Sequence, residues 1–208
     1  MIYERRFNAM KSDLEIIRSK AEENGGFLKT SQLKEMKLDY RQIQKLMEKG
    51  LLEKVKNGLY KLRGSNSTEE ELVSGLFPDG VLCMESALYY HGYTSIPPLS
   101  WNIAVNKDTS KSRFDITYPF VKPFYYEKDQ LMMGAVEGEI EGCRMQVYNK
   151  ERTICDCLKF ENKMERGLYT QAIRAYIDDP EKDPKLLFEY AAKRRIYKKA
   201  KDVLGIWL

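Results

Sequence analysis

The sequence predicts an α+β protein with an amino-terminal winged helix-turn-helix, followed by a mixed α/β domain whose last third is helical. Three observations predict this fold. Helical periodicity in the segment 1–64 ends in a hairpin signal, a polar stretch of small residues follows, and the rest mixes strand and helix patterns. We place a DNA-binding domain at residues 1–64, a linker at 65–75 and an α+β domain at 76–208.

The first helix is predicted from apolar residues that recur at steps of three and four and therefore share one face. They are Phe7, Met10, Leu14, Ile17 and Ala21. The Asn-Gly-Gly sequence at 24–26 ends this helix. A brief second helix is expected, with Thr30 as its cap and with Leu33 and Met36 facing the core.

The third helix is predicted to begin at Asp39, which forms a capping-box variant with Gln42, and to end at Gly50. In a winged helix-turn-helix this helix enters the major groove of DNA, and outward residues near its amino end reach the base edges. The candidate base contacts are Arg41, Gln44 and Lys45.

A β-hairpin is predicted next, because two short strand patterns at 51–56 and 59–62 flank the turn sequence Asn57-Gly58. A two-residue turn pairs Lys54 with Lys61, and like charges opposed across strands are unfavourable unless a phosphate backbone passes nearby. The candidate phosphate contacts are Lys54, Lys56, Asn57, Lys61 and Arg63. The alternative is a solvated hairpin whose lysines keep an edge strand from aggregating.

The second domain is predicted to open with a mostly buried helix at 82–90 that ends at His91 and Gly92. We expect His91, the single histidine, to have a packing or capping role, with its charged form favoured by the helix dipole. Strands are expected at 101–105 and 143–148. The aromatic stretch at 114–126 fits either a strand core or a stacking surface for single-stranded nucleic acid.

Three helices are predicted after residue 150. The first is capped by Thr153, the second carries residues 168–176, and the third begins with Asp183 as cap and Pro184 at its first position and continues toward Trp207. A basic cluster on the last helix is a solvated face, a second nucleic-acid contact or a docking surface for an acidic partner. Its members are Lys193, Arg194, Arg195, Lys198, Lys199 and Lys201.

Composition places the chain with globular proteins, since 43% of its 208 residues are hydrophobic and 32% are charged. No run approaches the roughly 20 apolar residues of a membrane span, and the amino terminus lacks signal-peptide features. We therefore expect a cytoplasmic protein that binds no membrane. The four cysteines lack the paired spacing of a zinc site, so we expect reduced, mostly buried thiols and no metal.

Charge is unevenly distributed. Residues 1–64 hold 15 Lys and Arg against 9 Asp and Glu, a net charge of +6, whereas the remaining residues hold 20 against 22, a net charge of −2. A basic module joined to a near-neutral domain is typical of nucleic-acid-binding proteins, although a charged surface alone produces the same imbalance.

Two parts of the sequence resemble the AbiE antitoxin family, AbiEi. The segment 50–60, GLLEKVKNGLY, resembles the wing of that family. The segments 86–92, SALYYHG, and 151–163, ERTICDCLKFENK, resemble its carboxy-terminal domain, in which an Arg-Thr pair opens a helix. The resemblance covers nearly the whole chain in order. The departure is Cys155, where the family is expected to have a small residue such as alanine.

The resemblance implies an antitoxin of a type IV toxin–antitoxin, or abortive phage infection, operon. Its winged helix would repress transcription by binding inverted repeats of double-stranded DNA in its own promoter, which would suit a homodimer on DNA. Its carboxy-terminal domain would neutralise a nucleotidyltransferase-like toxin, directly or indirectly. By this resemblance Arg41, Gln44 and Lys45 would read DNA, and Lys54, Lys56 and Lys61 would hold phosphates.

Two alternatives stay open. A stand-alone, ligand-responsive regulator would need a defined pocket in its second domain. A nucleotidyltransferase would need a Gly-Ser loop followed by two carboxylates one residue apart for Mg²⁺. Gly64-Ser65 is present, but the acids at 69–71 and Asp79 lack that spacing on a strand. We therefore expect no enzyme, no catalytic residues, no metal and no cofactor.

Overall fold

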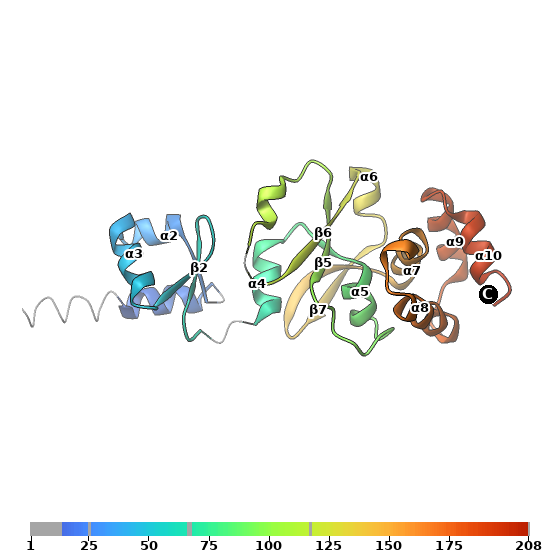
Figure 1. The fold of residues 1–208 in the computed structure, drawn as a ribbon, viewed down its shortest axis with the longest axis horizontal. Coiled ribbons are helices and arrows are strands. Elements are labelled where there is room, and N and C mark those ends of the chain that lie inside the picture. The colour runs from blue at the N-terminus through green and yellow to red at the C-terminus, as the bar shows by residue number, and fades with distance from the viewer. Residues whose placement is uncertain (1–13, 25, 66–67, 117, 208) are drawn as a thin grey trace, which may run out of the picture. The chain divides into compact units, whose positions relative to one another are not determined.

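The computed structural model describes residues 14–207 except 25, 66–67 and 117 (Figure 1). It consists of helices and two β-sheets, which confirms the predicted α+β class. The chain forms two compact units, and each is described by itself. The first contains the described residues up to Gly75 together with Asp115–Tyr118, and the second contains Leu76–Phe114 and Pro119–Leu208. Phe7 and Met10 of the predicted first helix lie outside the described residues.

The first unit begins with a helix over residues 14–22. Strand β1 (Phe27–Lys29), helices α2 (Thr30–Glu35) and α3 (Tyr40–Glu48), and strands β2 (Leu52–Lys56) and β3 (Leu59–Leu62) follow. The strands form an antiparallel sheet in the order β1-β3-β2. Strand β1 was not predicted, because so short a strand is insufficient to show a period. The core of the unit holds the predicted Ile17, Ala21, Leu33 and Ile43.

Helix α3 begins and ends as predicted. The Asp39 carboxylate accepts from the backbone N–H of Gln42 at 2.8 Å, and the Gln42 side chain accepts from the backbone N–H of Asp39 at 2.8 Å. Gly50 follows the helix in the left-handed region, with φ 65°. The predicted Thr30 cap is wrong, because Thr30 is the first residue inside α2 and Lys29 is its cap. There the Gln32 side chain accepts from the Lys29 N–H at 2.7 Å.

Helix α4 (Glu69–Leu76) occupies much of the segment predicted as a linker, with three glutamates in its first turn. Strand β4 (Val81–Leu82) and helix α5 (Met84–Tyr90) follow, so the helix predicted from residue 82 begins at residue 84. Strands β5 (Trp101–Asn106) and β8 (Cys143–Tyr148) match the predicted strands.

A 3₁₀ turn at Lys111–Phe114, strand β6 (Val121–Tyr126), helix α6 (Lys128–Leu131) and strand β7 (Ala135–Ile140) complete this part of the second unit. The sheet order is β6-β5-β4-β8-β7. Its outer pairs differ, since β5 and β6 are parallel and β7 and β8 antiparallel. No helix within the described ranges is both long and apolar enough to cross a membrane.

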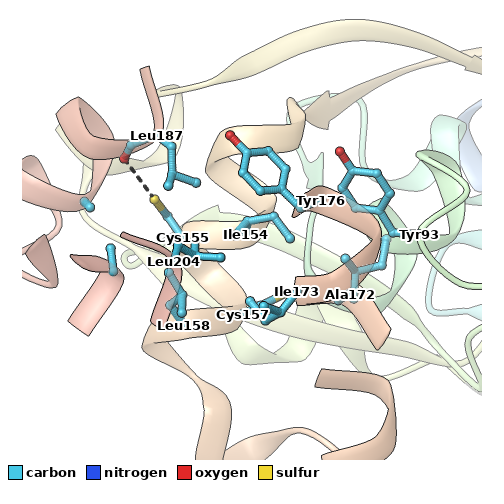
Figure 2. Close-up of a cluster of buried hydrophobic side chains, with 13 residues drawn as sticks. Tyr93, Ile154, Cys155, Cys157, Leu158, Ala172, Ile173, Tyr176, Leu187 and Leu204 are labelled. Atoms are coloured by element: carbon cyan, nitrogen blue, oxygen red, sulfur yellow. Dashed lines mark hydrogen bonds between the residues drawn. The ribbon is translucent and has the colours of Figure 1, made fainter. Parts of the chain in front are cut away.

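The carboxy-terminal third is helical, as predicted, with α7 (Lys150–Lys159), a 3₁₀ turn at Glu161–Lys163, α8 (Arg166–Asp178), α9 (Pro184–Lys193) and α10 (Tyr197–Leu204). Every residue of 151–158 is buried, because α7 lies between the sheet side of the unit and helices α8 to α10 (Figure 1). Figure 2 shows its apolar face, where the Cys155 thiol donates to the Leu187 carbonyl at 3.5 Å. Ala172 and Tyr176 of α8 pack in the same cluster.

Two details of these helices differ from the prediction. The cap of α7 is Asn149, whose side chain accepts from the Arg152 N–H at 3.0 Å, whereas Thr153 lies buried inside the helix. The predicted last helix is two helices. The chain turns after α9 because Arg195 adopts the left-handed region, with φ 59°, and the Ile196 N–H donates back to the Ala191 carbonyl at 2.9 Å.

Candidate functional site

The outer side of α3 carries the residues that the sequence predicts as base contacts. Arg41 and Lys45 are exposed and lie one turn apart, while Ile43 anchors the opposite side of the helix in the core. Gln44 is half-buried, and its side-chain amide donates to the Tyr40 hydroxyl at 2.8 Å. Tyr40 itself is 70% exposed. Tyr40 is not among the predicted contacts, although an aromatic residue directly after a helix cap is a visible signal.

The register of the hairpin differs from the predicted one, which placed two lysines opposite each other. Lys54 lies opposite Tyr60, and Lys61 lies opposite Glu53, so the predicted pairing of Lys54 with Lys61 is wrong. The register shifts between Lys54 and Lys56. Leu52 and Val55 are three residues apart, so a regular strand would place them on opposite faces, yet both are buried. A bulge brings both to the core, and the opposed charges become a favourable pair.

The remaining predicted phosphate contacts lie in different surroundings. Lys54 and Asn57 are exposed on the hairpin. Its turn is held by the Gly58 carbonyl, which accepts from the Thr30 N–H at 2.8 Å at the start of α2. The Lys61 ammonium lies 5.9 Å from the centroid of the Phe27 ring.

Lys56 is half-buried opposite Leu59, as the predicted turn requires. Arg63 is exposed, but it lies near the end of α3 instead of at the hairpin turn. Its Nη1 atom is 2.8 Å from the place where a Cβ on Gly50 would lie. Lys54 and Asn57 are therefore the members of the predicted set that the hairpin presents most openly to a ligand.

The carboxy-terminal basic cluster is not one helical face. Lys193 ends α9, whereas Lys198, Lys199 and Lys201 belong to α10. The placement of Arg194 on this surface is wrong, because the residue is 2% exposed and its side chain points into the protein. Lys199 pairs with Glu161 at 2.7 Å. Arg195, Lys193, Lys198 and Lys201 are exposed.

Arg194 instead joins a buried charged cluster that was not predicted. Its guanidinium forms an ion pair with Asp156, and the Arg152 Nε lies 3.3 Å from the same carboxylate. The side chains of all three residues are 0% exposed. The signal in the sequence was an arginine and an aspartate at an i,i+4 spacing in α7, which places them on one helix face.

The surroundings of Arg152 explain how a guanidinium is kept in the core. Its Nη1 donates to the carbonyls of Gln130 at 2.8 Å and Met133 at 3.0 Å, and its guanidinium carbon lies 4.3 Å from the centroid of the Tyr148 ring. Gly134 follows with φ 77°, and an added Cβ there would lie 2.6 Å from the Cβ of Arg152. Burial lowers the pKa of Arg152, but the combined effects of Asp156, Tyr148 and Tyr126 outweigh it, so the net pKa is raised.

A second polar network lies at the start of α7. Lys150 donates to Asp179 at 2.8 Å and to Glu181 at 2.9 Å, and the Tyr93 hydroxyl donates to Asp179 at 2.6 Å. Burial alone would raise the pKa of Asp179, but the hydrogen bonds from Lys150 and Tyr93 outweigh it and lower that pKa to about 2. This network holds the α8–α9 connection in place near α7.

His91 has the packing and capping role that was predicted, but its electrostatics are the reverse. It is the C-cap of α5, and its Nε2 lies 2.7 Å from the Tyr148 carbonyl oxygen. Because a carbonyl oxygen only accepts, Nε2 carries the proton. Burial lowers the pKa of His91 below its ordinary value and outweighs the opposite effect of the Tyr148 carbonyl.

The thiols are free, and three of them, Cys83, Cys155 and Cys157, are buried. Burial raises the pKa of Cys155 to about 12, which leaves the thiol protonated and unreactive. Within the described ranges no group of three or more His, Cys, Asp or Glu residues is placed to hold a metal ion. No protein-family model matches the chain, and no curated protein matches it.

Proposed function

We propose that the first unit is a winged helix-turn-helix that binds double-stranded DNA with α3 in the major groove. The observation that carries this proposal is the exposed pair Arg41 and Lys45 on the outer side of α3, opposite the buried Ile43. The order of α2, α3 and a β-hairpin is typical of this motif. The net charge of +6 over the segment 1–64 supports binding to phosphate.

Within this proposal each residue has a defined task. Arg41 and Lys45 read base edges together with Gln44, while Gln42 is occupied by the helix cap. Lys54 and Asn57 on the hairpin contact phosphates. Lys61 lies opposite Glu53, so opposed lysines do not support phosphate contacts by the hairpin. The support is that Lys54 and Asn57 are exposed.

We further propose that the protein is an autorepressor and antitoxin of a type IV toxin–antitoxin operon. The support is the sequence resemblance of residues 50–60, 86–92 and 151–163 to the AbiEi family. In this role the first unit binds inverted repeats in the promoter of its own operon, and the second unit counteracts a nucleotidyltransferase-like toxin.

The DNA-binding proposal is tested by fluorescence anisotropy with DNA from upstream of the gene, at two salt concentrations and against a scrambled duplex. We expect tight, salt-dependent binding that the Arg41→Ala/Lys45→Ala variant loses by at least about tenfold. Arg18→Ala/Lys20→Ala, on the helix at 14–22, removes the same charges and is the matched control. Equal losses in both variants, or binding that ignores sequence, would contradict base reading by α3.

The antitoxin role is tested separately by co-expression with the protein encoded beside the gene. Expressed from an unrelated promoter, the full-length Arg41→Ala/Lys45→Ala variant should still restore growth, because the proposal assigns protection to the second unit. If neither the wild type nor this variant restores growth, the antitoxin proposal fails while the DNA-binding result stands.

A further inference from the structure

The five-stranded sheet of the second unit has two edges, and they are built differently. Strand β6 forms one edge and strand β7 the other. The even-numbered residues of β6 bond to β5, since the carbonyls of Phe120 and Tyr126 each accept a backbone N–H from that side at 2.8 Å. Because backbone direction alternates along a strand, Pro123 lies where the backbone points away from the sheet. Proline has no N–H to donate there, so this edge resists a further strand.

Strand β7 contains no proline, and its edge is open. All six of its residues pair with β8 in one continuous register. Directly before the first pair, the Asn149 N–H donates to the Gly134 carbonyl at 2.8 Å, so the even-numbered residues of β7 are the ones that bond to β8. The N–H and C=O groups of Glu137 and Glu139 therefore point to the open side, where no hydrogen bond joins them to another described residue.

The side chains along this edge differ between the two faces of β7. Glu137 and Glu139 are exposed on one face. Glu137 lies opposite the neutral Gln146 and Glu139 lies opposite Arg144, but neither glutamate forms an ion pair within the described ranges. Val136 lies on the other face and is 41% exposed. The open edge thus combines free backbone groups with two carboxylates on one face and an apolar side chain on the other.

We propose that β7 binds an extended, basic segment of a partner protein, which adds to the sheet as a further strand antiparallel to β7. The segment pairs with the outward N–H and C=O groups of Glu137 and Glu139. Lysine or arginine side chains at alternate positions lie opposite the two carboxylates, and an apolar residue between them packs beside Val136. The partner segment is therefore one in which basic and apolar residues alternate.

A second copy of β7 does not suit this edge. Only residues whose backbone points outward can pair, so two antiparallel copies place a glutamate opposite a glutamate in either register that pairs most of the strand. Glutamates at an edge also discourage pairing with neutral strands. Both effects select a basic segment. Strand β7 holds none of the residues assigned to DNA, so the test of this inference is independent of the DNA-binding proposal.

The experiment measures binding of a labelled peptide, TVKVKVT, to the full-length protein by fluorescence anisotropy. Two methylated forms of the peptide separate backbone pairing from charge attraction, because both keep all side chains. Backbone N-methyl groups on the two lysines remove the N–H groups that face β7, whereas N-methyl groups on two valines lie on the far side of the new strand. We expect the lysine-methylated peptide to bind at least about tenfold more weakly than the valine-methylated one.

Substitutions of Glu139 test the backbone edge from the side of the protein. Glu139→Pro and Glu139→Gln lose the same charge, but only proline also loses the outward N–H. That N–H makes no bond to β8, so the proline copies at this edge the block that Pro123 provides at the other. Glu139→Pro should weaken peptide binding at least about threefold more than Glu139→Gln does.

A second pair of variants tests the charge. Glu137→Gln/Glu139→Gln should weaken binding by about three- to tenfold and reduce its salt dependence, because two cross-strand charge pairs are lost. Glu189→Gln/Asp202→Asn removes two charges from exposed positions on α9 and α10 and is the matched control. Its affinity for the peptide should equal that of the wild type.

Hydrogen exchange followed by NMR locates the bound peptide. At saturation the amides of Glu137 and Glu139 should exchange at least about tenfold more slowly than in the free protein. Unchanged exchange at these amides, equal binding of the two methylated peptides, or equal losses in the β7 and control charge variants would overturn the proposal. A dimer of the free protein that Glu139→Pro dissociates would also overturn it, because a second copy would then occupy the edge. If Glu139→Pro does not fold, the methylated peptides decide, since they leave the protein unchanged.

Discussion

The Asp156 carboxylate is expected to be the electrostatic centre of the second unit, and Asp156→Asn tests this. The substitution keeps the shape of the side chain and removes the charge between Arg152 and Arg194. All three side chains are 0% exposed, so water does not screen the loss. Removing one partner of a buried ion pair costs about 3–5 kcal/mol, and we expect the free energy of unfolding to fall by about that amount. The expected loss is that of one buried ion pair and not of two, because Asn retains an oxygen that accepts from Arg152.

The assay is urea denaturation in phosphate-free buffer, followed by tryptophan fluorescence. Trp101 and Trp207 both belong to the second unit, so the transition reports the unit that holds Asp156. Asp178→Asn makes the same chemical change at an exposed position at the end of α8, and it is the matched control. Its free energy of unfolding should stay within about 0.5 kcal/mol of the wild type.

A loss below about 1 kcal/mol for Asp156→Asn, well short of the usual cost of breaking a buried pair, or equal losses for the two variants, would refute the reasoning. Such a result would mean that the carbonyls and aromatic rings around Arg152 hold the guanidinium without help from the carboxylate.

Three further substitutions test other parts of the structure, each by urea denaturation. His91→Gln should flatten the pH dependence of stability between about pH 7.5 and pH 5. Because the folded pKa is lowered, the unfolded chain binds the proton more readily, so wild-type stability falls once the pH drops below the ordinary value of 6.5; equal slopes would contradict this. Gly50→Ala should cost about 1–2 kcal/mol in the first unit, monitored by circular dichroism, because φ is +65° and the new Cβ would meet Arg63 at 2.8 Å; an unchanged midpoint would contradict the left-handed turn. Glu53→Lys should lower the free energy of unfolding by up to about 1 kcal/mol, because it places a lysine opposite Lys61, whereas Lys54→Glu should lower it less. The reverse order would favour a hairpin without a bulge, in which Lys54 lies opposite Lys61.

Several local signals in the sequence were read correctly, because their partners are close neighbours in the chain, although the caps predicted at Thr30 and Thr153 were wrong. The capping box of Asp39 and Gln42, the turn at Asn57-Gly58 and the start of α9 at Asp183 with Pro184 all lie as predicted. Asp183 accepts from the Leu186 N–H at 3.0 Å, within the first turn of the helix. Such contacts form within one turn of chain, so the residues themselves determine them.

The errors in the two sheets have a different cause. The bulge between Lys54 and Lys56 depends on which residues the core of the first unit accepts, and simple alternation does not contain that information. Strand β7 pairs with β8 through Glu137 opposite Gln146 and Glu139 opposite Arg144. Its apolar residues do not alternate regularly, because Ala135 and Val136 are adjacent and Val136 is exposed.

The sequence by itself determined the α+β class, the ends of α3 and the basic character of the segment 1–64, because composition and short-range hydrogen bonds depend only on neighbouring residues. The tertiary structure alone decided that Arg194 is buried. Its partner Asp156 lies much earlier in the chain, on α7, and the fold brings the two together by packing α9 against α7. A basic run in a sequence is equally compatible with a solvated face and with a buried ion pair, and only the location of a distant carboxylate distinguishes them.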